Sequence, residues 1–159
     1  MKRIFLILSS MWISLLSTIT VSSDPDTRHI ISLNEMQRHH LLSEMRALLE
    51  GTQVILQSLA KQDMAAIAQH SRRLGTAMPH TGERHLHKIL PQSFVKMGMQ
   101  VHQGFDQVAV EAETSQRPET ILQQLSDITR TCVDCHAAYQ IRLRVVPADK
   151  HPNKSDHDH

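Results

Sequence analysis

The chain of 159 residues is close to electrically balanced, with 17 Lys and Arg against 16 Asp and Glu, and only 3% of its residues are aromatic. A near-neutral chain without a basic stripe is a poor candidate for binding nucleic acid. The sequence also lacks a glycine-rich phosphate loop, a nucleophile elbow and a pair of inward-facing carboxylates. Nothing in it therefore predicts an enzyme.

Residues 1–23 have the layout of a secretory signal peptide, in which Lys2 and Arg3 precede an apolar stretch that ends in small residues. We expect the mature chain to begin near Asp24 and the protein to be periplasmic. Serines interrupt the apolar stretch, which favours cleavage over an uncleaved membrane anchor. About 136 residues then remain, enough for one domain with a hydrophobic core.

Apolar residues recur at spacings of three and four along the mature chain, which predicts four helices and no strands. The first helix runs from residue 33 or 38 to residue 60. Its apolar face is formed by Leu41, Met45, Leu48, Thr52, Ile55 and Leu59. Asp63 has the position of an N-cap for the second helix. The inner face of that helix is formed by Met64, Ile67, Ser71, Leu74 and Met78.

Proline marks the start of the other two predicted helices, with Pro91 in the first turn of the third and Pro118 opening the fourth. The third helix has an inner face formed by Phe94, Gly98, Val101, Phe105, Val108 and Ala112. The fourth has one formed by Ile121, Leu125, Ile128, Cys132, Cys135 and Tyr139. We therefore predict an all-α fold, an antiparallel up-down-up-down four-helix bundle over residues 24–146. The polar His/Asp-rich tail, residues 147–159, is expected to be disordered.

The only two cysteines of the chain lie in the stretch TCVDCHAAY, residues 131–139. Cys-x-x-Cys-His is the attachment pattern of c-type haem, in which both thiols form thioethers with the haem vinyl groups and the next imidazole reaches the iron. Cys132 and Cys135 are thus predicted to attach one haem c, with His136 as the proximal ligand of the iron. An exported protein suits covalent attachment, because free thiols would be oxidised there.

Two other interpretations of the cysteine pair stay open. One is a redox dithiol or a structural disulfide. A thioredoxin-like pair, however, belongs at a helix N-terminus beside a βαβ unit, whereas this pair is predicted deep in a helix. The other is a structural zinc site, which needs about two more ligands in a matched pair. The chain has no second pair of cysteines.

A haem-attachment motif in the last of four helices, followed by Tyr139, resembles the class II c-type cytochromes, the cytochrome c-prime family with its low-spin relatives. The resemblance covers residues 33–144, and it is most specific at the motif. It implies the same three haem-binding residues as the motif itself. Members commonly carry a basic residue after the tyrosine, where this chain has Gln140. Arg142 and Arg144 are candidates to replace that charge.

The resemblance also implies a distal ligand from the first helix. The stretch LLSEMRALLEGTQVILQSLAKQD resembles the family segment, and Met45 lies where low-spin members have a methionine and high-spin members an aliphatic residue. Met45 is on the apolar face of the helix, whereas Met36, His39 and His40 face away at about 100° per residue. We therefore predict Met45 as the distal iron ligand. The alternatives are an open or water-occupied distal site, a histidine ligand, and a core methionine that does not touch iron.

The other titratable residues predict little chemistry. The histidines of the polar loop and the tail are weak candidates for a metal site, namely His80, His85, His87, His151, His157 and His159. His102 lies one position beyond the inner face of the third helix, and it is expected to bond to backbone or water. Glu44 and Glu50 are expected to be solvated, and Tyr139 to pack near the haem edge.

These residues favour a monohaem electron carrier whose iron cycles between Fe(III) and Fe(II) with His136 and Met45 as axial ligands. Its expected partners are redox proteins that meet a small patch near the haem edge. The alternative function is a five-coordinate haem protein that binds or sequesters nitric oxide or carbon monoxide. A haem-free thiol redox module would need intact Cys132 and Cys135. Homodimers through the first helices are common among the proteins that this chain resembles.

Overall fold

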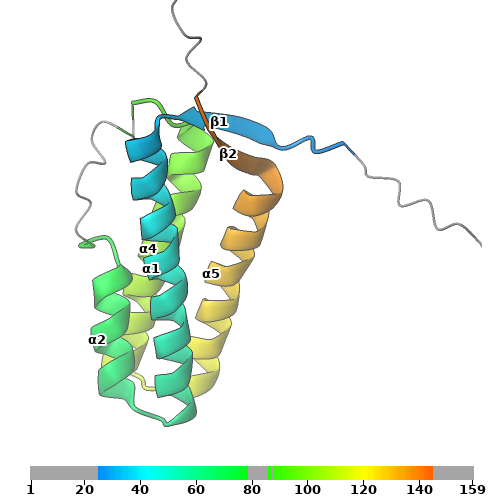
Figure 1. Ribbon diagram of the computed structural model, residues 1–159. Helices are drawn as coiled ribbons and strands as arrows, with labels where there is room; N and C mark the ends of the chain where they lie inside the picture. The colour runs from blue at the N-terminus through cyan, green and yellow to red at the C-terminus, as the bar shows by residue number, and fades with distance from the viewer. Residues whose placement is uncertain (1–24, 79–85, 87, 145–159) are drawn as a thin grey trace, which may run out of the picture.

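The computed structural model describes residues 25–78, 86 and 88–144. They form four helices and one parallel sheet of two strands, which confirms a mainly helical fold. Figure 1 shows the helices lying alongside one another, with the sheet across one end. None of the helices in the described part of the chain is long and apolar enough to cross a membrane. The predicted signal peptide and tail, residues 1–23 and 147–159, lie outside the described residues.

Helix α1 spans Glu35–Ala60, close to the predicted limits. Its first turn is a capping box, in which Gln37 N donates to the Asn34 side chain at 2.8 Å and Asn34 N donates to the Gln37 side chain at 3.0 Å. Two backbone donors that have no partner within the helix are satisfied in this way. The start of α1 is thereby fixed directly after strand β1, which spans His29–Leu33.

Helix α2 spans Met64–Leu74. Asp63 is its N-cap, as predicted, and the Asp63 side chain accepts a hydrogen bond from Ala66 N at 3.0 Å. The helix ends earlier than predicted, because the backbone of Gly75 is extended. Met78 therefore lies beyond the helix instead of on its inner face.

The two prolines mark the helix starts that the sequence predicts. Helix α4 spans Gln92–Glu113 and is preceded by Pro91, and helix α5 spans Pro118–Ala138 with Pro118 as its first residue. The missing N–H of proline is tolerated there, since the first N–H groups of a helix have no partner within it.

The prediction that the chain has no strands is wrong. Strand β2 spans Tyr139–Leu143 and pairs in parallel with β1, so that His29 lies opposite Tyr139 and Leu33 opposite Leu143. Tyr139 was expected on the last helix, but its backbone is extended, with φ −128° and ψ 150°. Burial of Ile31 and Leu33, which are 4% and 1% exposed, stabilises this short sheet.

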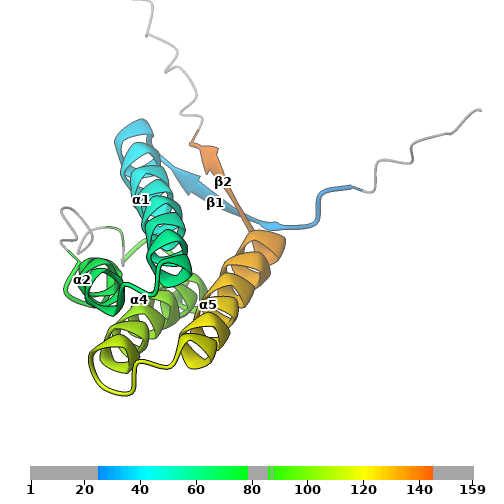
Figure 2. The same cartoon turned by 90° about the horizontal axis from the view of Figure 1, so that it is seen from below.

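The hydrophobic core has two parts. The larger lies between the helices and is formed by Ile55, Ile67, Ala68, Leu74, Val101, Phe105, Val108, Ala112, Ile121, Leu125 and Ile128. The smaller, which we call the sheet cluster, is formed by Ile31, Leu33, Leu41, Leu86 and Phe94. Helices α1, α2, α4 and α5 pack in succession, each against the next. Figures 1 and 2 show that α1 and α5 diverge toward the sheet.

Two glycines of α4 provide a matched test of this packing. A Cβ on Gly98 would meet nothing within 4 Å, whereas one on Gly104 would lie 2.6 Å from Ile128 Cγ1. Gly98→Ala is expected to raise the free energy of unfolding by about 0.5–1 kcal/mol, because glycine costs about that much inside a helix. Gly104→Ala is expected to lower it by about 1 kcal/mol, since overpacking against a stiff β-branched side chain outweighs the same gain. Urea denaturation followed by circular dichroism measures the free energy of unfolding of each variant. A higher free energy of unfolding in both variants would contradict the close approach of α4 and α5.

Candidate functional site

The Cys-x-x-Cys-His motif lies in the last two turns of α5, near the sheet and not deep within the helix. Cys132 is exposed and Cys135 is half-buried, and neither forms a disulfide. His136 is exposed. The prediction that both cysteines face the core is therefore wrong for Cys132. The reason is the divergence of α1 from α5, which leaves this side of the last α5 turns uncovered.

The two thiols do not have the properties of a reactive dithiol. Although Cys132 is exposed as a residue, partial desolvation of its thiol raises its pKa, and partial burial together with the nearby Cys132 raises the pKa of Cys135. Their position near the C-terminal end of α5 also disfavours a thiolate, because that end of a helix carries partial negative charge. Catalytic thiols instead have a lowered pKa, as at a helix N-terminus.

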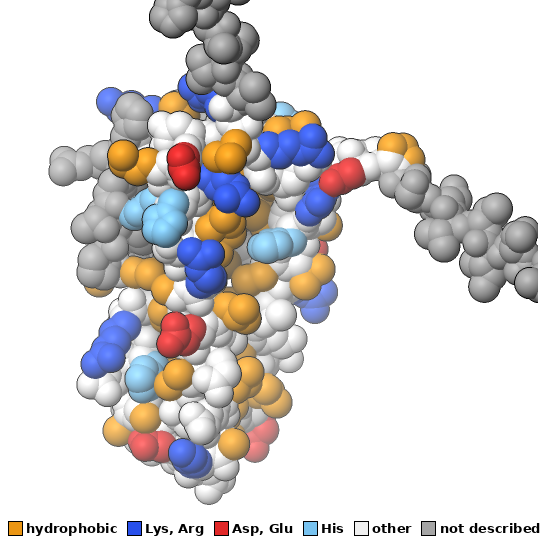
Figure 3. Space-filling model, in the orientation of Figure 1, with side chains coloured by type: hydrophobic (Ala, Val, Ile, Leu, Met, Phe, Trp, Pro, Cys, Tyr) orange, Lys and Arg blue, Asp and Glu red, His pale blue; other side chains and the backbone are white. Residues whose placement is uncertain are grey.

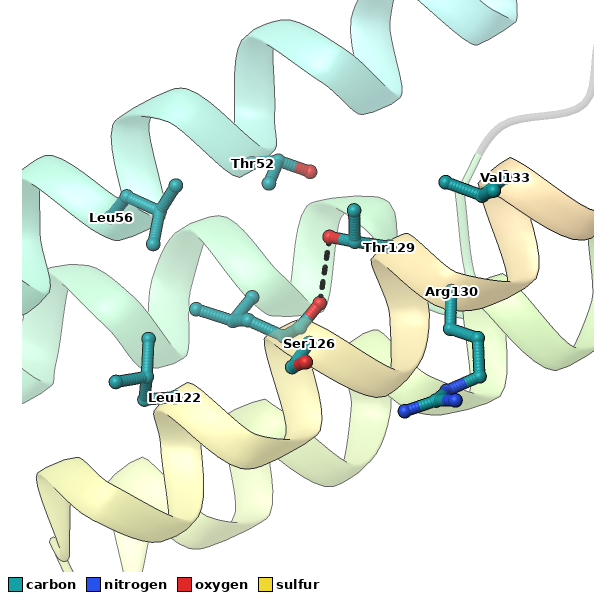
Figure 4. A pocket seen from close by; sticks show the side chains of 8 residues that line it. Thr52, Leu56, Leu122, Ser126, Thr129, Arg130 and Val133 are labelled. Carbon is teal, nitrogen blue, oxygen red and sulfur yellow. Dashed lines mark hydrogen bonds between the residues drawn. The ribbon is translucent and has the colours of Figure 1, made fainter.

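A cavity of about 440 Å³ lies between α1 and α5, a size typical of cofactor and ligand sites. Its walls are formed by Thr52, Leu56, Leu122, Leu125, Ser126, Thr129, Arg130 and Val133. Figure 4 shows Thr52 and Leu56 of α1 opposite the α5 side chains. The Thr52 and Thr129 hydroxyls donate to carbonyls of their own helices, at 2.7 and 2.8 Å, so the walls are mainly apolar. Figure 3 shows hydrophobic side chains gathered along this face, with basic side chains around them toward the sheet.

Met45 and His136 do not line this cavity, but helix geometry puts them in line with its two walls, toward the sheet. At about 100° per residue, Met45 lies within about 20° of Thr52 and Leu56 around α1. On the same count His136 lies within about 20° of Thr129 around α5. Met45 precedes Thr52 and His136 follows Thr129, each by about two turns, and the sheet lies at the start of α1 and the end of α5. The residues predicted as distal and proximal ligands thus share one end of the groove between α1 and α5.

Side chains of both α1 and α5 also pack against the sheet cluster. Met45 of α1 and Cys135 of α5 are both partly buried and both pack against it. Tyr139 packs there as well, with its ring edge-on to Phe94 and His29 at centroid distances of 5.4 and 5.8 Å. The Tyr139 hydroxyl also shares a hydrogen bond of 2.5 Å with the Ser93 hydroxyl. These contacts of Tyr139 fix the C-terminal end of α5, where the motif lies.

A buried polar network beside Met45 was not predicted. His102 is only 5% exposed, and its Nδ1 lies 2.7 Å from the Leu74 carbonyl, which confirms the expected backbone bond. Its Nε2 lies 3.3 Å from the Glu44 carboxylate. The expectation that Glu44 is solvated is wrong, since its side chain is 14% exposed. A buried imidazole has two ring nitrogens to satisfy, and this requirement draws the carboxylate inward.

Arg142 and Arg144 make hydrogen bonds within the sheet. Arg142 Nε donates to the Gln140 side chain at 2.8 Å, and Arg144 donates to the Ser32 carbonyl at 3.4 Å. A third arginine, Arg28, donates to the His136 carbonyl at 3.4 Å, and no sequence pattern indicated this contact. The arginine that contacts the motif thus comes from the segment before β1.

The predicted metal candidates among the other histidines lie elsewhere. His80, His85 and His87, like the histidines of the tail, are outside the described residues. Within residues 25–78, 86 and 88–144, no group of three or more His, Cys, Asp or Glu is placed to hold a metal ion.

Comparison of the chain with protein-family models, with curated proteins and with solved structures gives no match. Its function is therefore inferred from the residues and the geometry above. The resemblance to class II cytochromes c stays a prediction from the motif and the order of the helices.

Proposed function

We propose that this protein is an exported monohaem c-type cytochrome that transfers electrons, built as the antiparallel up-down-up-down four-helix bundle of the class II type. The observation that supports the proposal is that Met45 of α1 and Cys135 of the Cys-x-x-Cys-His motif pack against the same sheet cluster, next to an apolar groove between α1 and α5. The two residues are 90 positions apart in the sequence.

The residues present fit a covalently held haem. Cys132 and Cys135 lie about one turn apart on α5 and are not joined to each other. The groove beside them is mainly apolar, as a porphyrin ring requires. Bound haem would supply a one-electron Fe(III)/Fe(II) couple.

The chain's own residues would hold that couple in place. His136 would bind the iron from the α5 side and Met45 from the α1 side, which is the Met/His pair that raises reduction potential in c-type cytochromes. Met45 is half-buried against the sheet cluster, which removes part of its side chain from water. The leucines of the groove would exclude water from the ring.

Exposure of the motif end supports exchange of electrons with protein partners. Cys132 and His136 are both exposed, so they would hold the haem where a protein partner could approach it. A donor protein would supply one electron and an acceptor protein would remove it. Contacts of this kind are small and short-lived. A periplasmic location follows from the signal peptide that the first residues predict.

The test is the intact mass and the visible spectrum of the mature protein, produced together with haem-attachment machinery. We expect a mass increase of one haem, a sharp low-spin reduced spectrum, and no change on addition of carbon monoxide. A high-spin spectrum that shifts with carbon monoxide would replace electron transfer by gas binding. A chain without haem mass and with two intact thiols would overturn the cytochrome proposal in favour of a thiol module.

A further inference from the structure

We infer that Arg28 is a positioning residue of the haem centre: it caps the C-terminus of α5 at the His136 carbonyl and holds a positive charge beside the proximal ligand. This inference rests on the proposed function, and it assigns a role to a residue outside the motif and outside every helix. Arg28 lies one residue before β1 in the sequence and 108 residues before His136.

The sheet determines where Arg28 lies. Its first residue pair is His29 opposite Tyr139, which places Arg28 level with the last turn of α5. Arg28 Nη1 donates to the His136 carbonyl at 3.4 Å, and Gln140 Nε2 donates to the Arg28 carbonyl at 3.2 Å. The residue is thus bonded to the chain on both sides of the α5 terminus.

A cation near the C-terminal end of a helix stabilises that end. The last four carbonyls of an α-helix have no partner within the helix, and together they carry partial negative charge. The Cys135 carbonyl accepts a hydrogen bond from Tyr139 N. Arg28 supplies the donor for the next carbonyl, that of His136. A cation in this place stabilises the helix end that carries the proposed iron ligand.

Asp26 orients the Arg28 guanidinium. The Asp26 carboxylate accepts hydrogen bonds from Arg28 Nη2 at 2.8 Å and from Nε at 2.9 Å, a two-point contact that fixes the plane of the group. Hydrogen bonding to Arg28 lowers the pKa of Asp26 to about 2 and raises the pKa of Arg28, so both groups are charged at neutral pH. Asp26 therefore offsets part of the charge of Arg28, and its removal is expected to have the opposite effect.

The charge of Arg28 has a predictable effect on the iron. Fe(III) carries one more positive charge than Fe(II), so a nearby cation favours the reduced state. The Arg28 side chain is 41% exposed, which means that salt screens this effect. A modest shift of the reduction equilibrium is expected, without loss of haem.

The experiment is a redox titration of the haem-loaded protein at 0.1 M salt. We expect Arg28→Gln to disfavour the reduced state about threefold, or about 30 mV at 59 mV per tenfold change for one electron. Arg28→Lys should keep the parent potential, and Asp26→Asn should shift it upward. Arg144→Gln is the matched control, because it removes the same charge from a residue just beyond the opposite end of the sheet. At about 3.3 Å per residue it lies about 16 Å beyond Tyr139, farther than the screening length of about 10 Å.

Each outcome decides the inference. A lowered potential in Arg28→Gln alone, with the opposite shift in Asp26→Asn, supports it. Equal shifts in Arg28→Gln and Arg144→Gln would show an effect of net charge only, and an unchanged potential in Arg28→Gln would show no role for this residue; either result overturns it. Intact mass separates these outcomes from failure of the proposed function, since a chain without haem overturns both.

Discussion

Met45→Ala is expected to convert the haem-loaded protein from a low-spin form, inert toward carbon monoxide, into a high-spin form that binds it. Met45 is the partly buried methionine of α1 and packs against the sheet cluster beside the motif, so its truncation would leave the distal side of the iron without a sulfur ligand. The visible spectrum of the oxidised and reduced protein, with and without carbon monoxide, measures the change. The reduction potential is expected to fall in the same variant, because the Met/His pair stabilises Fe(II).

Met36→Ala is the matched control for this prediction. Met36 is on the same helix, but it is 81% exposed and faces away from the groove, so its removal should leave the spectrum unchanged. If Met45→Ala also leaves a low-spin spectrum unaltered, another residue is the distal ligand. A parent protein that is already high-spin would show that Met45 is a core methionine, and the gas-binding function would then take precedence.

The double variant Cys132→Ala, Cys135→Ala is expected to carry no covalently bound haem at all. The described chain offers no other thiol, so no thioether can form. Each single variant is expected to retain haem through one thioether and at lower yield. Intact mass under denaturing conditions measures the covalent bond, and the visible spectrum of the native protein reports any haem that is held by ligation alone.

Asp134→Ala controls for general damage to the motif. Asp134 also lies between the two cysteines, but it is exposed and does not line the groove, so the variant should attach haem as the parent does. Haem mass in the double variant would locate the attachment elsewhere and overturn the assigned role of the cysteines. Loss of haem from Asp134→Ala to the same extent would point to misfolding of the last α5 turns.

The helices could be predicted closely because their signals are local. Asp63 and Pro118 mark helix starts through effects within one turn of the chain, and the apolar spacing of three and four is visible in any short window. The strands could not be predicted in this way. Each has five residues, and the pairing of His29 with Tyr139 joins the two ends of the described chain. No local pattern reports a partner at that separation.

The candidate site also combines features that are local in the sequence with features that depend on the tertiary fold. The roles proposed for Cys132, Cys135 and His136 depend on three positions within five residues, so the motif alone predicts them. Met45 is predicted from the family resemblance and from its place on one helix face, and its packing against the sheet cluster depends on the tertiary fold.

The sequence by itself determined the mainly helical class and the helix starts at Asp63 and Pro118, and it predicts the chemistry of the motif, since these depend on neighbours within a few residues. Only the tertiary structure decided that the motif ends a helix, that Cys132 is exposed, and that Arg28 reaches the His136 carbonyl. It also decided that Glu44 is drawn inward to the buried His102. The physical reason is common to these cases: burial, helix capping and charge pairing are satisfied by whichever groups the packed chain brings near, whatever their distance in the sequence.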